Sequence, residues 1–130
     1  NATTWNPNLN SSVNTLLFDD GLLYVGGDFT TANGAARNRA ACFNLPNNAP
    51  IPWNPNANGS INTLIENNGR IIAGGSFTSI GNIGSEARNR LAELEKNSGN
   101  ATAWNPNLNS TVEHLSKHDG KLIVAGSFNQ

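Results

Sequence analysis

Residues 53–77 read WNPNANGSINTLIENNGRIIAGGSF, and this stretch decides the fold because close copies of it occur three times in the chain. The motif Trp-Asn-Pro-Asn begins at Trp5, Trp53 and Trp104, at spacings of 48 and then 51 residues. After each Trp come an apolar residue, a Leu, an Asn-Gly or Asp-Gly pair and a second apolar run that ends in Phe. Repetition at this period is typical of proteins built from stacked copies of one small unit.

The sequence predicts four short strands in each repeat. Asp-Gly and Asn-Gly between apolar stretches favour tight hairpins, which would pair residues 13–18 with 22–28 and residues 61–66 with 70–76. Third strands are predicted at 39–45 and 90–95. Fourth strands are predicted at 50–54 and 101–105, where Pro55 and Pro106 stop the ladder because Pro has no N–H to donate.

Sheets that recur at this period are typical of a β-propeller. A β-solenoid has shorter turns, and a β-sandwich would not require near-identical repeats. We therefore expect an all-β partial propeller of about two and a half four-stranded blades, with a ring that this chain alone does not close. Residues 1–130 form one domain, with repeats at approximately 5–52, 53–103 and 104–130, the last incomplete. The remainder of the propeller is expected from the same or other chains.

Composition excludes several classes of function. The formal net charge is −1 and 13% of the residues are charged, so no broad field attracts nucleic acid or an anionic membrane. No run approaches the roughly 18 apolar residues of a membrane-spanning helix, so we expect neither nucleic acid binding nor membrane insertion. The 24 Asn and 13 Gly residues indicate turns rather than helices.

Most residues that could carry chemistry have a structural interpretation that we favour. The tryptophans Trp5, Trp53 and Trp104 are predicted to anchor their blades, although their rings could stack on sugars. The apolar residues Val13, Ile61 and Val112, and the leucines Leu16, Leu64 and Leu115, are expected in equivalent buried places.

The ionisable residues give even weaker evidence for a functional site. Arg37 and Arg39, and likewise Arg88 and Arg90, alternate on a predicted extended segment and could clamp a carboxylate, but capping of loop carbonyls is the favoured role. Cys42 is the single cysteine and is interpreted as a packing residue, although its alignment with Glu93 suggests some exposure. We predict no catalytic residue, no cofactor and no metal ligand; Asp28, His114 and His118 have no repeated partner.

The repeated motifs resemble the delta-60 repeat, a bacterial β-propeller repeat of the domain-of-unknown-function kind. The resemblance is carried by Trp-Asn-Pro-Asn, by the Gly-Gly-(Asp/Ser)-Phe and Ala-Gly-Ser-Phe segments, and by Ala-Arg-Asn-Arg. It implies a propeller in a large secreted or surface-displayed bacterial protein, and it implies no catalytic residue. The expected location is therefore secreted or cell surface.

The expected function is a non-enzymatic scaffold that mediates protein binding or surface assembly. The alternative is a lectin-like propeller that binds carbohydrate, so the ligand is an unknown protein or glycan. Residues 30–36 and 78–87 are loops of different length between similar strands, and surface loops can vary without disturbing a core. We predict that both loops lie at one end of the ring, with a partner contacting Asn33, Asn82, Ile83 and Glu86.

Overall fold

The computed structural model describes residues 4–82 and 85–127, and its regular structure there consists of β-strands only. The first blade is the sheet β1-β2-β5, and the second blade is the sheet β6-β7-β10, both antiparallel throughout. The third blade is the hairpin β11-β12. The strands of these blades are β1 (Val13–Asp19), β2 (Leu22–Gly27), β5 (Ala40–Phe43), β6 (Ile61–Asn67), β7 (Arg70–Gly75), β10 (Leu91–Glu95), β11 (Val112–His118) and β12 (Lys121–Gly126).

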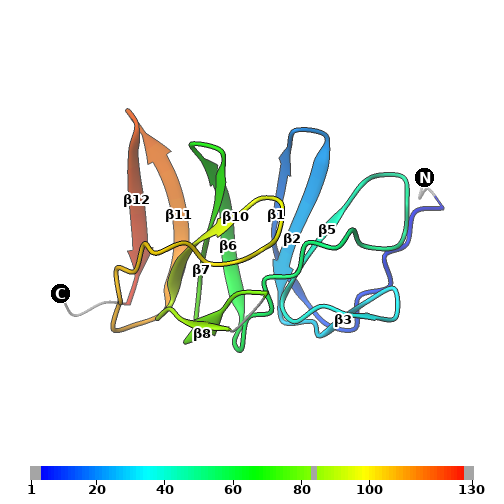
Figure 1. Cartoon of the computed structure of the whole chain (residues 1–130), viewed down its shortest axis with the longest axis horizontal. Helices are drawn as coiled ribbons and strands as arrows, with labels where there is room; N and C mark the ends of the chain where they lie inside the picture. The colour runs from blue at the N-terminus through cyan, green and yellow to red at the C-terminus, as the bar shows by residue number, and fades with distance from the viewer. Residues whose placement is uncertain (1–3, 83–84, 128–130) are drawn as a thin grey trace.

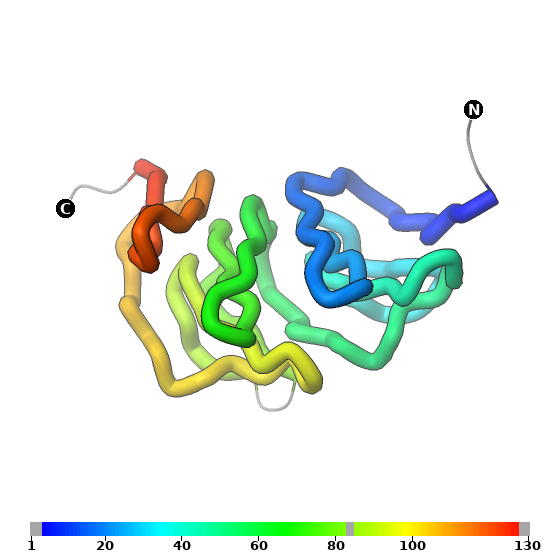
Figure 2. The backbone as a smooth tube through the Cα atoms, turned by 90° about the horizontal axis from the view of Figure 1, so that it is seen from above, coloured from blue at the N-terminus to red at the C-terminus, as the bar shows by residue number. Residues whose placement is uncertain are grey.

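The three blades follow one another along an arc (Figure 2). The blades contact one another mainly through their first strands, since β6 packs between β1 and β11. The hairpin turns of all three blades lie at the upper end in Figure 1. The described residues thus form part of a β-propeller, and the sequence-based fold class is confirmed. In the described part of the chain there is no helix long and apolar enough to cross a membrane.

The prediction of a fourth strand in each blade is wrong. Residues 50–54 form no strand, and residues 101–105 make one isolated bridge, between Ala101 and Leu94. One backbone bond joins the first segment to the third strand, from the Ile51 amide to the Cys42 carbonyl. Two join the second beside its bridge, from the Thr102 amide to the Glu93 carbonyl and from the Glu95 amide to the Asn100 carbonyl. Pro50 and Pro52 remove two donors from the first segment. In both segments an Arg side chain donates to a backbone carbonyl, that of Ile51 or Thr102.

Two short hairpins occupy the loops that the sequence left without structure. They are built from β3 (Thr31–Ala32) with β4 (Ala35–Ala36), and from β8 (Ser79–Ile80) with β9 (Glu86–Ala87). Both lie at the lower end in Figure 1, opposite the blade hairpins. Residues 30–36, and residues 78–82 and 85–87 of the longer loop, therefore emerge at the same end of the molecule, as predicted.

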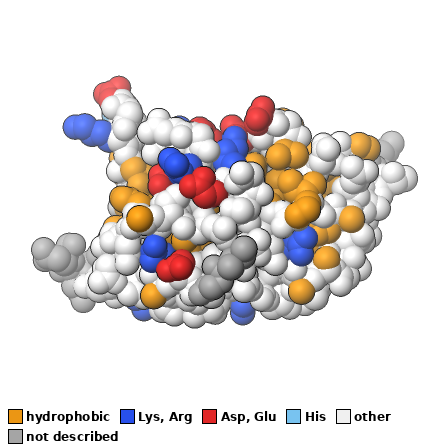
Figure 3. All heavy atoms as spheres, in the orientation of Figure 1, with side chains coloured by type: hydrophobic (Ala, Val, Ile, Leu, Met, Phe, Trp, Pro, Cys, Tyr) orange, Lys and Arg blue, Asp and Glu red, His pale blue; other side chains and the backbone are white. Residues whose placement is uncertain are grey.

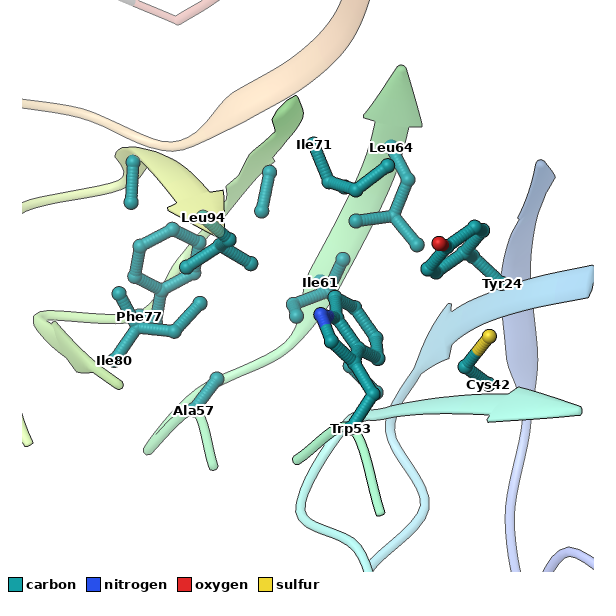
Figure 4. Close-up of a cluster of buried hydrophobic side chains, with 13 residues drawn as sticks. Tyr24, Cys42, Trp53, Ala57, Ile61, Leu64, Ile71, Phe77, Ile80 and Leu94 are labelled. Atoms are coloured by element: carbon teal, nitrogen blue, oxygen red, sulfur yellow. The ribbon is translucent and has the colours of Figure 1, made fainter. Parts of the chain in front are cut away.

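The largest core cluster lies between the first and second blades (Figure 4). Tyr24 and Cys42 of the first blade face Leu64, Ile71 and other residues of the second. A second cluster joins the second and third blades through Ile72, Leu91, Val112 and Leu115. The alternation of side chains along each strand buries both faces of the middle blade, which accounts for its nearly continuous apolar runs.

The equivalent apolar positions are buried in two repeats and exposed in the first. Ile61, Leu64, Val112 and Leu115 are buried, whereas Val13 is 44% and Leu16 is 63% exposed. The expectation of burial is wrong for the first repeat because these two side chains point away from the second blade. In the described residues nothing from a preceding blade covers them.

Candidate functional site

The end of the arc that carries the two short hairpins is the candidate binding site, and the Arg-Asn-Arg segments form its base. Arg37 donates to the carbonyls of Ala36 at 2.8 Å and Ile51 at 3.1 Å. Arg88 makes the same two bonds, to Ala87 and Thr102, both at 2.7 Å. These guanidinium groups cap backbone carbonyls, as favoured from the sequence.

The second Arg of each segment joins consecutive repeats. Arg39 and Arg90 each donate from Nη1 at 3.3 Å, to the carbonyl of Ala57 and of Leu108 respectively. Both have φ of 68°, so the predicted extended segment is wrong at these positions. The turn sends the two Arg side chains of a pair to different backbone segments, and they do not form a shared clamp for a carboxylate.

An asparagine braces the start of each loop. The Asn58 side-chain oxygen accepts from the amides of Thr78 at 2.8 Å and Ser79 at 3.0 Å, while its Nδ2 donates to Thr78 Oγ1. Asn10 makes the same contacts with Thr30 and Thr31. The sequence shows Asn10 and Asn58 as repeated residues, but the long separation from their partners hides this role.

Three of the residues predicted to contact a partner lie in or beside the short hairpins, with Glu86 in strand β9. Asn33 is exposed, has φ of 48°, and donates its amide to the Pro7 carbonyl at 2.7 Å. Asn82 and Glu86 are exposed on the equivalent loop of the second blade. Ile83 lies outside the described residues. The three described side chains are accessible, and the structure does not test whether they bind anything.

The three tryptophans have different environments. Trp53 is 1% exposed, donates from Nε1 to the Glu95 carbonyl at 3.1 Å, and meets the Tyr24 ring edge to face at 5.0 Å. Trp5 is half-buried and donates to the Asn47 carbonyl at 2.8 Å. Trp104 is 39% exposed. The anchoring arrangement is thus complete at Trp53.

Cys42 is fully buried beside its cross-strand neighbour Tyr24, so the exposure suggested by its alignment with Glu93 is wrong. Burial raises the pKa of the Cys42 thiol to about 12, and burial likewise raises the pKa of the Tyr24 hydroxyl to about 12. A thiol with this pKa is protonated at neutral pH and is a poor nucleophile. The polar replacement at Glu93 is satisfied locally, since Glu93 accepts from Thr102 Oγ1 at 2.7 Å.

The remaining candidates for chemistry do not converge. Asp28 is exposed and accepts from Asn14 Nδ2 at 3.4 Å. His114 and His118 are exposed on the third blade, where His118 lies 3.4 Å from Asp119. Among residues 4–82 and 85–127 no three His, Cys, Asp or Glu side chains gather as metal ligands would.

A comparison with protein families agrees with this architecture. Residues 19–45 and 66–98 match the family described as "Domain of unknown function (DUF5122) beta-propeller". Both stretches are similar to repeats of the DUF5122 beta-propeller family. The resemblance to a propeller repeat of unknown function is therefore confirmed. No curated protein and no solved structure gives a significant match to the chain.

The two DUF5122 matches cover equivalent parts of the first and second blades. Each begins at the blade hairpin and ends beyond the third strand, so each includes the short hairpin and the Arg-Asn-Arg segment. The matched region thus includes the Arg side chains that bond backbone carbonyls, whereas Asn10 and Asn58 lie outside it. The DUF5122 match gives the fold and names no ligand.

Proposed function

We propose that this chain is a non-enzymatic propeller scaffold of a secreted or cell-surface bacterial protein, and that it binds a protein partner at the loop end. One observation carries the proposal. The polar side chains shared by the first two repeats bond backbone inside the molecule, whereas Asn33, Asn82 and Glu86 lie on loops that differ between these repeats and are exposed to solvent.

Loops that differ in sequence but are held by the same contacts at their bases are well placed to bind a partner. The Arg and Asn contacts are reproduced almost atom for atom in the first two repeats, so the loops start from equivalent, rigid positions. The loop in the second repeat is three residues longer. Binding residues are commonly placed on loops held by a rigid scaffold.

The non-enzymatic part of the proposal is supported by the state of the candidate groups. The Cys42 thiol is buried, with its pKa raised to about 12, and the Arg guanidinium groups are bonded to carbonyls. The secreted or cell-surface location is supported by the resemblance to the delta-60 repeat.

Carbohydrate binding is the second candidate, and Trp5 favours it. A pocket of about 280 Å³ lies beside this ring and is lined by Thr4, Trp5, Leu45 and Pro46. An indole beside an open, mostly apolar pocket could stack on a sugar ring. This pocket is separate from the loop residues Asn33, Asn82 and Glu86, so the two candidates make different predictions.

The test replaces residues 78–87 by the shorter sequence of residues 30–36. A phage-displayed random peptide library is selected on the wild-type chain, and the selected peptides are measured on the loop-swapped chain. We expect at least a tenfold loss of binding by a chain that still melts cooperatively, at a lower temperature because the swap replaces the buried Ile80 with Ala. His118→Ala and Asp119→Ala, at the opposite end of the arc, serve as controls and should leave binding unchanged.

Two outcomes contradict the proposal. Peptides that bind the loop-swapped chain with undiminished affinity would show that the loop end is not the preferred site. A glycan array that gives specific binding to the wild type and none to Trp5→Ala would favour the lectin-like alternative.

A further inference from the structure

The contact between successive blades follows one steric rule. Ile61 of the second blade lies over Gly26 of the first, and a Cβ on Gly26 would lie 2.6 Å from Ile61 Cγ2. Val112 of the third blade lies over Gly74 of the second, and a Cβ there would lie 2.5 Å from Val112 Cγ1. Carbon atoms in contact are normally about 3.5–4.0 Å apart, so each blade needs a glycine beneath the apolar residue of the next.

The same contact carries a side-chain hydrogen bond that recurs at both junctions. The ladder between the first two strands of each blade has a bulge at Asn14, Asn62 and Glu113. A bulge redirects the side chain of its extra residue. Asn14 Nδ2 donates to the Ile61 carbonyl at 3.2 Å, and Asn62 Nδ2 donates to the Val112 carbonyl at 3.0 Å. Each bulge thus joins its blade to the next.

The open face of the first blade retains the apolar half of this contact. Val13 and Leu16 occupy the positions of Ile61 and Leu64 in the second blade, and both are exposed, as is Phe18 at 66%. Figure 3 shows hydrophobic side chains gathered over the part of this view that belongs to the first blade.

The pocket beside Trp5 belongs to the same face. Its wall residues Trp5 and Leu45 are equivalent to Trp53 and Lys96 of the second blade. Both of those contact the preceding blade, Trp53 through the Tyr24 ring and Lys96 through Asp19. This face therefore carries residues at the positions that contact the preceding blade in the second repeat.

The open face of the third blade lacks the complementary half. The glycine position of Gly26 and Gly74 is Ala125, and the bulge asparagine is replaced by Glu113. In the register of the internal contacts, the Ala125 methyl would meet a valine γ-methyl at the 2.5 Å found for Gly74 and Val112. A carboxylate has only acceptors at neutral pH and cannot donate to the facing carbonyl.

We propose that the first-blade face formed by Trp5, Val13, Leu16, Phe18 and Leu45 binds a separate repeat of this family that carries Gly and Asn where this chain has Ala125 and Glu113. The occupant is not a second copy of this chain in the register of the internal contacts. Leu45, which replaces Lys96, further selects a repeat without an acidic residue at the position of Asp19. This proposal does not depend on binding at the loop end.

The experiment turns the chain itself into the stated partner. The donor carries Glu113→Asn and Ala125→Gly, with Leu16→Asp added so that its own first-blade face is closed. The receiver is the wild-type chain. The matched control donor carries Leu16→Asp alone, and the control receiver is also Leu16→Asp. Thermal melts establish that each variant folds, and sedimentation velocity of mixtures measures binding.

We expect the triple-variant donor to form a 1:1 complex with the wild-type receiver, with an affinity at least tenfold higher than that of the control donor. The Leu16→Asp receiver should bind neither donor. Equal affinities for the two donors would overturn the proposal in favour of a second copy of this chain. A folded triple variant that gives no complex with the wild-type receiver would overturn it as well.

Discussion

The indole N–H of Trp5 and that of Trp53 each donate to a carbonyl 42 residues further along the chain. The same offset from Trp104 would fall beyond the last residue of this sequence. The motif around each Trp is the same, so a sequence argument assigns all three the same role. Burial differs because the acceptor carbonyl lies 42 residues away and the ring that packs on Trp53, Tyr24, comes from another repeat, and local sequence encodes neither contact.

Truncation of Trp53 should therefore be far more costly than truncation of Trp104. We expect Trp53→Ala to lower the free energy of unfolding by about 3–5 kcal/mol, the range for a buried large aromatic. Trp104→Ala should cost less, because its ring is 39% exposed. Urea titrations of both variants measure the difference, and equal losses would show that the Tyr24 contact at Trp53 contributes little.

The buried Cys42 and Tyr24 should make stability fall in alkali. Both have pKa values raised to about 12 in the folded chain. Unfolding restores the ordinary values, about 8.5 for Cys and about 10 for Tyr. Stability is thus fully present below about pH 8.5 and is lost as pH rises toward 12, where the unfolded chain releases protons that the folded chain retains.

Melts from pH 7 to 11 test this expectation. Cys42→Ala and Tyr24→Phe should each flatten the decline, and thiol labelling on unfolding is expected for the wild type and absent in Cys42→Ala. Rapid alkylation of Cys42 in the native wild type at pH 8 would contradict its burial.

At the scale of the strands, the glycine beneath each apolar residue sets the spacing between blades. Gly74→Ala should destabilise the chain by about 1–3 kcal/mol through overpacking. Val112→Ala should cost less in the Gly74→Ala background than in the wild type, because it removes the methyl that the new Cβ would meet. Gly26→Ala with Val112→Ala pairs residues of different contacts and should be additive. Additivity of both pairs in urea titrations would contradict the steric rule.

Arg88, which bonds the segment where a fourth strand was predicted, offers a second test at this scale. Arg88→Lys cannot span the Ala87 and Thr102 carbonyls with one ammonium group, and we expect a loss of about 1–3 kcal/mol. Hydrogen exchange at the Thr102 amide should accelerate. Arg70→Lys is the control, since Arg70 and Glu95 form an exposed pair worth about 0–1 kcal/mol. Unchanged exchange at Thr102 would show that Arg88 does not hold this segment.

Hairpins were predictable and the outer edge of each blade was not. Asp20-Gly21 and Asn68-Gly69 determine local turns, and the strands beside them end within one residue of the prediction. The segment after β10 has the composition of a strand, but its Thr102 carbonyl is bonded by Arg88, 14 residues earlier. The short hairpin β8-β9 was missed because two-residue strands carry no detectable alternation.

The open faces of the first and third blades are different. This difference becomes visible only when the blades are seen together in the structure. The sequence predicted blade stacking and unclosed ends correctly in outline. It did not show that Val13 and Leu16 would be exposed, because their counterparts in the other repeats are buried by residues of the preceding blade. Exposed apolar side chains on a sheet face promote association.

Phe18 provides the test of that association at the scale of the whole chain. Its equivalents in the other repeats are Glu66 and Lys117, which lie 3.5 Å apart as an ion pair, so a charged side chain is compatible with this position. Phe18 is 66% exposed, and its replacement removes little buried area.

We expect Phe18→Glu to change the free energy of unfolding by no more than about 0.5 kcal/mol, as for other surface substitutions. It should also weaken binding of the Glu113→Asn, Ala125→Gly, Leu16→Asp donor, as measured by sedimentation velocity. Leu122→Glu, on the half-buried face of the third blade, is the control and should destabilise the chain instead. Undiminished binding of that donor to Phe18→Glu would show that Phe18 is not part of the first-blade binding face.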